Sequence, residues 1–517
     1  GLRWDRIEPW YEVNNGISTF EPGVQSQVFP GAPPGILYPG DPGVSRTLSP
    51  PGNLDFAPRV GLAYSPSAAS DTLVGKILGG PGNSSIRAGF GIYYESIEAL
   101  SIGILAGNAP FGITYTSPAP PLFATPFVTA SSGQFVGQPF PATLATGKAS
   151  INDPNSNVDW SQYEPISGIP AYAATNRIPY VEEYMLSWQR QLGTKTVFSA
   201  SYVGNQGHRL LVLVEANPGN PALCLSLSQP SQVAPGSPTC GPFGENNVFT
   251  TASGQVINGT RGPLGPNFGS NTYQSTIGKS NYNSLQISLN HTSGRLDLSA
   301  GYTYGKSLDD SSNLGEEVNP TNPNLSYGLS SFDLRHNFVA SYNYKLPFDA
   351  WFHASNQWAE GWEISGIVHL STGFPVTLYS YGDNSLLGAE PNGINNYGVD
   401  VPDYTGGPLN LNHSPQNGQP YFNVSQFTIN ALGTPGNVPR RFFSGPGMEN
   451  YDMAVVKNVR LGETKSLQLR VEAFNLFNHP QFFGPQTVDG NIGSATFGQI
   501  ISSDPPRLMQ LGAKFYF

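Results

Sequence analysis

The C-terminal segment is the feature that most constrains what this chain can fold into. Residues Gln510–Phe517 read polar-x-Gly-x-x-aromatic-x-aromatic and end on an aromatic residue. In a period-2 strand, Met509, Leu511, Ala513, Phe515 and Phe517 share one side. A soluble domain that exposed such a strand would present an unpaired, aggregation-prone edge, whereas a membrane barrel pairs its last strand and turns it toward lipid. The segment therefore favours a transmembrane β-barrel, and an ordinary terminal strand of a β-sandwich is the alternative.

The composition supports the barrel. Charged residues make up only 12% of the chain, about half of the ~25% found in ordinary globular proteins. The 60 glycines and 47 prolines could suggest disorder, but 12% of the residues are aromatic, and disordered chains are poor in aromatic residues. No break in composition separates domains, so we expect residues 1–517 to form one large barrel domain with long loops.

Membrane insertion through a helix is not expected. The sequence has no apolar run of about 18 residues or more, which a transmembrane helix needs, but barrel strands need only about 9–11 residues of alternating polarity. The opening residues Gly1–Arg6 read as the middle of a strand and not as a signal peptide. Because an outer-membrane protein is exported, the chain is predicted to be N-terminally truncated.

Alternating polarity predicts three β-hairpins and several single strands. The hairpins are expected at Glu183–Asn205, Ser284–Lys306 and Tyr451–Phe474. The single strands are expected at Ala57–Ser65, Ser85–Tyr94, Arg335–Leu346 and Trp362–Ser371. With the terminal strand and weaker segments, this gives about thirteen strands.

One side of these strands is apolar and the other is polar, as expected for a strand that faces lipid on one side. In the second hairpin, Leu285, Ile287 and Leu289 alternate with Gln286, Ser288 and Asn290. Tyr and Trp lie near the strand ends, as in the interfacial girdles of membrane barrels. Short turns alternate with long connections, which is the outer-membrane arrangement. The long loops are predicted at Phe111–Pro179, Asn205–Ser280, Lys306–Asp333 and Thr377–Met448.

Several segments of the chain resemble one family, the Oar-like TonB-dependent receptors. The most specific of these segments is Leu469–Pro480, which reads LRVEAFNLFNHP. The others are Asn53–Tyr64, Ile86–Glu95, Tyr302–Asp310, Phe332–His336, Gly361–Gly366 and Phe497–Ile500. The resemblance extends from about residue 1 to residue 517.

The resemblance implies an exported receptor with a carboxypeptidase-regulatory-like domain, a plug and a barrel of about 22 strands. Neither of the first two domains nor a TonB box is recognisable here, so we expect the C-terminal part of such a barrel. It further implies an outer-membrane location, an unknown small ligand, and contact with the TonB complex through the missing N-terminal region. We expect this chain alone not to perform energy-coupled transport.

The terminal pattern itself resembles the signal read by the outer-membrane barrel assembly machinery. The residues that carry it are Gln510, Gly512, Phe515 and Phe517. Outer-membrane lipid and the assembly machinery are therefore expected partners. The net charge of −10 and the lack of a basic run give no support for nucleic-acid binding.

The residue patterns of the chain predict neither a catalytic site nor a metal site nor a bound cofactor. The seven histidines are scattered without metal-ligand spacing. Asp309–Asn313 could offer oxygen ligands to calcium, but it lacks the glycine and terminal glutamate of a calcium loop, so a solvated loop is expected. Cys224 and Cys240 are either a loop disulfide, which suits an oxidising compartment, or two free thiols.

Two pairs of residues in and after the strand at Leu467–Phe474 are also candidates for specific contacts. Arg470 and Glu472 point to the polar side of their strand, either for contact with a plug or pore or as a charge pair within the wall. Asn475 and Asn478 follow that strand and are expected to make turn contacts.

Three hypotheses for function remain at this point. The first is an outer-membrane TonB-dependent receptor or transporter, which is not an enzyme and whose ligand-binding residues the sequence does not identify. The second is a secreted β-rich binding module or glycan-active enzyme, which would need paired carboxylates across a cleft. The third is a passive porin-like channel, which needs no plug.

Overall fold

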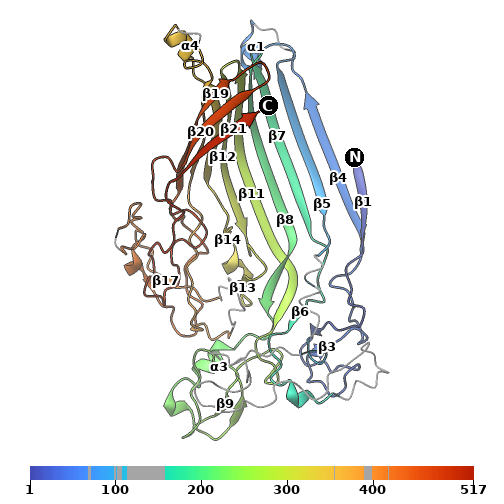
Figure 1. Ribbon diagram of the computed structural model, residues 1–517. Coiled ribbons are helices and arrows are strands. Elements are labelled where there is room, and N and C mark those ends of the chain that lie inside the picture. Colours follow the sequence, from blue (N-terminus) through green and yellow to red (C-terminus); the bar gives the residue numbers. More distant parts are fainter. Residues whose placement is uncertain are drawn as a thin grey trace.

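The protein is built around one long, curved antiparallel sheet (Figure 1). The computed structural model describes residues 1–67, 71–97, 101, 108–112, 158–353, 356–388, 399–416 and 418–517. The prediction of an all-β architecture is confirmed, and the sheet is mostly antiparallel, with parallel pairing only where two short strands join it within the described residues.

The main path of the sheet joins twelve strands, each antiparallel to its neighbours. In sheet order they are β1 (Leu2–Ile7), β4 (Gly52–Tyr64), β5 (Ser84–Tyr94), β7 (Tyr180–Leu192), β8 (Thr196–Glu215), β11 (Thr272–Ser293), β12 (Leu296–Asp309), β15 (His336–Lys345), β16 (Trp362–Ser371), β19 (Met448–Arg460), β20 (Ser466–Phe474) and β21 (Leu508–Tyr516). Within the described residues, β1 and β21 are not paired with each other, so the sheet has two open edges.

The remaining elements are short and lie in the connections. The strands are β2 (Thr19–Phe20), β3 (Ile36–Leu37), β6 (Pro170–Tyr172), β9 (Val248–Thr250), β10 (Val256–Asn258), β13 (Glu317–Val318), β14 (Gly328–Leu329), β17 (Asp403–Tyr404) and β18 (Phe427–Thr428). The α-helices are α1 (Leu73–Leu78), α3 (Pro221–Leu225) and α4 (Phe348–Trp351). Short 3-10 helices cover Trp160–Gln162, Pro230–Gln232, Pro323–Ser326 and Val424–Gln426. None of the described helices is long and apolar enough to cross a membrane.

The predicted hairpins and single strands are confirmed, with one correction to a predicted loop. β8 runs to Glu215 and β11 begins at Thr272, so the loop predicted at Asn205–Ser280 is shorter than expected. The pairing register of β11 with β8 shifts between Ser275 and Lys279. Such an irregularity breaks the strict alternation on which strand prediction depends.

Long connections and short turns lie at opposite ends of the sheet (Figure 1). The short end carries the turns after β7, β11 and β19, together with α1 and α4. The long connections cover residues 8–51, 95–179, 216–271, 310–335, 372–447 and 475–507. Most of the predicted loop Phe111–Pro179 lies outside the described residues.

One face of the sheet is apolar and the other is polar, as the pairing of residues across the strands shows. Ile287 lies opposite Ala200 and Tyr302, whereas Ser288 lies opposite Ser199 and Gly301. Toward the edges the apolar face is open, with Leu62 64% and Leu511 78% exposed. In the described part of the chain, the additional sheets have only two strands each, so the fold is not a sandwich of two large sheets.

Candidate functional site

The described parts of the long connections pack together and form hydrophobic cores of their own. The first core includes Phe20, Phe29, Tyr38, Trp160 and Phe268. The second surrounds the Cys224–Cys240 disulfide and includes Phe249 and Leu386. The third includes Tyr421, Phe422, Phe427, Phe443 and Val488. Buried aromatic side chains supply much of the apolar area that orders a loop, so this end of the molecule is a packed platform.

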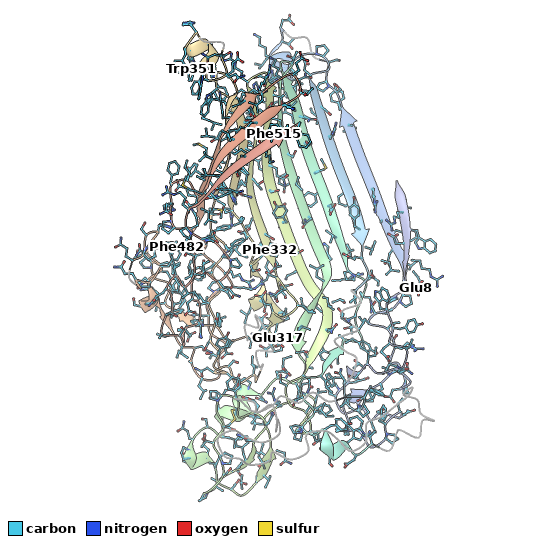
Figure 2. The ribbon with its side chains drawn as sticks, viewed as in Figure 1. Glu8, Glu317, Phe332, Trp351, Phe482 and Phe515 are labelled. Carbon is cyan, nitrogen blue, oxygen red and sulfur yellow. A yellow bond between two sulfur atoms is a disulfide. The ribbon has the colours of Figure 1, made fainter. Side chains whose placement is uncertain are left out.

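A cavity of about 620 Å³ opens between the connection after β12 and the connection before β19. Its wall includes the charged side chains Lys306, Glu316, Glu317 and Arg335, together with Tyr327 and Tyr379. Glu317 lies in β13, at the end of the sheet that carries the long connections (Figure 2). Binding pockets for small molecules combine apolar walls with a few placed polar groups, and this cavity has that character.

Buried ion pairs join the two connections beside this cavity. Arg440 places one guanidinium nitrogen 2.7 Å from Asp309 Oδ1 and the other 2.7 Å from Glu316 Oε2. Arg441 pairs with the second carboxylate oxygen of Glu316 and also donates to Thr377 Oγ1 at 2.8 Å. Glu316 is 5% exposed and Arg441 only 2%. The two loops are therefore held by charges that are largely shielded from solvent.

The carboxylate at the centre of this network stays ionised because of its partners. Burial alone would raise the pKa of Glu316, but the Arg441 and Arg440 guanidiniums hold that pKa below its ordinary value. The backbone N–H of Ser312 also donates to Glu316 Oε2, at 2.7 Å. A paired and hydrogen-bonded buried charge is stable, whereas removing one partner leaves an uncompensated charge.

The expectation that Asp309–Asn313 forms a solvated loop is wrong for its two aspartates, although Asn313 is exposed. Asp309 and Asp310 are each 5% exposed. Asp309 pairs with Arg440 and accepts a hydrogen bond from Ser312 Oγ at 2.9 Å. Asp310 accepts from the backbone N–H of Lys279 at 2.8 Å. The compensating charge for Asp309 comes from Arg440 in a distant loop. The sequence around Asp309 could not indicate this partner.

A second buried cluster joins the disulfide-bonded connection to residues 383–388. Arg261 donates to the carbonyl of Gly388 at 2.8 Å and lies 4.0 Å from Glu245. Asp383 accepts from the backbone N–H of Phe243 at 3.1 Å and from that of Gly388 at 2.9 Å. Burial and the neighbouring Asp383 raise the pKa of Glu245 to about 8. Two carboxyl groups thus share one partly compensated site between the loops.

This cluster predicts that the contact between the two loops weakens as pH rises. A carboxyl group whose pKa is raised in the folded state stabilises that state below its ordinary pKa, and the stabilisation is lost as pH passes through about 8. Burial also raises the pKa of Asp400, whose partners Ser385 and Asn430 lie within the 372–447 connection. Hydrogen-exchange protection factors for residues 216–271 should fall between about pH 4.5 and about pH 8, the interval between the ordinary and the raised pKa of Glu245. In Glu245→Gln, which cannot ionise, most of this dependence should disappear, and an unchanged pH profile would contradict the assignment.

The other residues singled out from the sequence lie in β20, in β21 and just after β20. Arg470 donates to Glu472 Oε1 at 2.7 Å, as a charge pair within one strand. Asn475 and Asn478 both have positive φ, and Asn475 Oδ1 accepts from the backbone N–H of His479 at 3.0 Å, which is a turn contact.

The terminal strand lies at an edge of the sheet. Gln510 and Gly512 lie opposite Glu472 and Arg470, and Phe515 lies opposite Leu467. Phe515 is 51% and Phe517 94% exposed, with ring centroids 6.0 Å apart. Phe515 lies near the short-turn end of the sheet (Figure 2).

Sequence reasoning missed the buried charges that join the loops, namely Glu245, Glu316, Asp383, Arg440 and Arg441. One signal was present, because adjacent like charges such as Arg440–Arg441 are rare in a chain with only 12% charged residues. Within the described residues, no group of three or more His, Cys, Asp or Glu side chains could hold a metal ion.

Comparison with known families defines the class of protein. Residues 1–510 match the model of the outer membrane beta barrel domain family. The match covers nearly the whole chain, so the chain belongs to this family and is an outer-membrane protein. The hypothesis of a secreted module is therefore set aside.

The solved structures that align with this chain include outer-membrane transporters and receptors. The outer membrane transporter YddB from Escherichia coli is 11% identical, with a TM-score of 0.41 over 90% of this chain and 41% of that chain. The siderophore receptor PirA from Acinetobacter baumannii is also 11% identical, with a TM-score of 0.37 over 90% and 41%. The FrpB iron transporter from Neisseria meningitidis is 11% identical, with a TM-score of 0.34 over 89% and 39%. The chain thus spans about two fifths of the length of these structures, and no curated protein matches it.

Proposed function

We propose that this chain is the barrel part of a TonB-dependent outer-membrane receptor or transporter of the Oar-like group. The observation that carries the proposal is the platform of packed connections with its cavity of about 620 Å³, lined by charged and aromatic side chains. Loops held on a rigid scaffold are where binding residues usually lie. Membership of the outer membrane beta barrel family and the segment Leu469–Pro480 support the same function.

The mechanism we infer has two parts. The long connections capture a ligand outside the cell, and the polar face of the sheet lines its path. Movement through the barrel draws on the TonB complex, which acts through a region that does not belong to residues 1–517. Siderophores, oligosaccharides and peptides all remain candidate ligands, because cavity walls with mixed charge suit each of them.

The test is uptake by cells that produce the protein at its natural length. Isotopically labelled ferric siderophores, oligosaccharides and peptides are offered with and without a protonophore. We expect one class to accumulate only when the proton-motive force is intact, and not at all in cells that make only residues 1–517. Uptake that persists with the protonophore would support the passive channel instead.

A matched pair of variants connects that uptake to the cavity. Arg335 lies in the cavity wall, 3.9 Å from Asp333, whereas Arg295 lies at the opposite end of the sheet beside Asp349. Arg335→Gln should raise the KM for uptake severalfold, and Arg295→Gln should leave it unchanged. Equal effects of the two variants would mean that the cavity is not the ligand site.

We also propose that Gln510, Gly512, Phe515 and Phe517 form the signal read by the barrel assembly machinery. The exposure of the two phenylalanines along an open edge strand supports this role. Deleting Phe517 from the protein at its natural length should lower its yield in the outer membrane without changing its synthesis. The measurement is the amount of heat-modifiable, protease-resistant barrel in membrane fractions. Equal yields with and without Phe517 would mean that this segment is an ordinary terminal strand and not an assembly signal.

A further inference from the structure

A lysine lies on the apolar face of the sheet near the short-turn end. Lys457 in β19 lies opposite Trp362 in β16 and Leu469 in β20, on the face that also carries Val455 and Val471. It is only 8% exposed, and its ammonium lies 5.0 Å from the centre of the Trp362 ring. A charge on a membrane-facing surface is costly unless polar groups surround it.

The connection between β15 and β16 supplies those polar groups. Lys457 Nζ donates to the backbone carbonyls of Gln357, Trp358 and Glu360, the Trp358 contact measuring 3.1 Å. An ammonium has three donors, so this lysine is fully satisfied by the protein.

The same connection is fixed to β19 at two further points. Gln357 Nε2 donates to the carbonyl of Arg460 at 2.8 Å. Gly361 has a φ of +77°, and a Cβ atom there would lie 2.3 Å from the carbonyl oxygen of Asn458, so a side chain would strain this close approach. Residues 356–361 are therefore clasped over the apolar face.

The clasp forms one wall of an apolar groove of about 430 Å³. The groove is lined by Trp358, Trp362, Val455, Val459, Leu469 and Val471, with Gln357 and Lys457. Val471 is 45% exposed, and its neighbour across the strands, Leu511, is 78% exposed. The groove is thus continuous with the open apolar face.

We propose that this groove binds an acyl chain of a phospholipid in the periplasmic leaflet of the outer membrane. Outer-membrane barrels have their short turns on the periplasmic side and expose their apolar face to lipid. The rim of this end carries Trp351, Phe352 and Trp358, which are 60%, 67% and 85% exposed, and such aromatic side chains favour the membrane interface. Trp351 lies beyond the end of the sheet, far from Glu317 and the long connections (Figure 2).

The hydrogen bonds of Lys457 limit which part of a lipid the groove can recognise. Because its three donors are used by backbone carbonyls, the ammonium does not serve as a phosphate ligand. The groove therefore selects the hydrocarbon chain and not the charge of the headgroup. Lys457 is a positioning residue, which keeps the Trp358 wall in place.

The experiment uses the protein at its natural length in nanodiscs that hold one molecule each. The discs contain phosphatidylethanolamine or phosphatidylglycerol with a diazirine in the acyl chain, and crosslinks are mapped by mass spectrometry. We expect peptides with Val455 and Leu469 to be labelled severalfold more than the β4 peptide with Leu62, equally with both headgroups. Leu469→Trp, which fills the groove, should abolish this excess, and Leu62→Trp, on the same face in β4, should not.

A second variant separates loss of the groove from misfolding. Lys457→Met keeps the length of the side chain but removes the clasp, so the excess labelling should fall while hydrogen exchange at residues 356–361 rises. Equal labelling of the groove and β4 peptides, or an excess that survives Leu469→Trp, would overturn the proposal. Crosslinking of the groove to a second protein copy, or labelling with only one headgroup, would also overturn it.

Discussion

Replacing Glu316 with glutamine should release the connection after β12 from the connection before β19. The variant leaves Arg440 and Arg441 buried with one carboxylate fewer, and Arg441 is only 2% exposed. Removing one partner of a buried ion pair costs about 3–5 kcal/mol. Since the ion pairs lie between two loops, the loss should appear as local opening and not as unfolding of the sheet.

Hydrogen exchange measures this opening directly. Protection factors for residues 310–335 and 399–447 should fall by orders of magnitude in Glu316→Gln, while those of β7, β8 and β11 remain. Glu463→Gln is the matched control, because Glu463 is exposed in the turn between β19 and β20. If the protection factors of the two loops are the same in Glu316→Gln as in Glu463→Gln, the ion pairs do not hold the two connections together.

Placing arginine at Ile287 should destabilise the membrane-inserted sheet far more than placing it at Ser288. Ile287 lies among Ala200 and Tyr302 on the apolar face, and Ser288 lies among Ser199 and Gly301 on the polar face. An arginine that faces lipid near the bilayer midplane costs about 2–4 kcal/mol. An arginine on the polar face should cost much less, because water and polar side chains surround it there.

The free energy of folding into lipid vesicles, from denaturant titration, separates the two sites. Because the substitutions are at adjacent positions of one strand, backbone effects of the two variants are closely matched. Similar costs at Ile287 and Ser288 would mean that the apolar face does not meet lipid. A larger cost at Ser288 would place the packed interior on the polar side.

The sequence by itself determined the strands, their faces and the class of protein. These properties are local, because side chains alternate with a period of two along each strand. Trp362–Ser371, for example, is a strand in the structure with the same bounds that its pattern predicts. The terminal strand Leu508–Tyr516 was readable for the same reason.

Where alternation failed, the prediction failed with it. The pairing of β8 with β11 continues beyond the register shift near Gly278, but the sequence around the shift reads as loop. A single extra residue in a strand moves the following side chains to the other face. The pattern of one strand could not indicate that its partner continues.

Only the tertiary structure decided which partners the buried charged residues meet. Asp309 meets Arg440 across 131 residues of sequence, and Lys457 meets Gln357 across 100. The local sequence makes Asp309–Asn313 look like a solvated loop, since Arg440, which pairs with Asp309, is distant in the sequence. The ion network, the cavity beside it and the clasp over the apolar groove all depend on partners that folding brings together, because burial of a charge is stable only when its counter-charge or hydrogen-bond partners arrive with it.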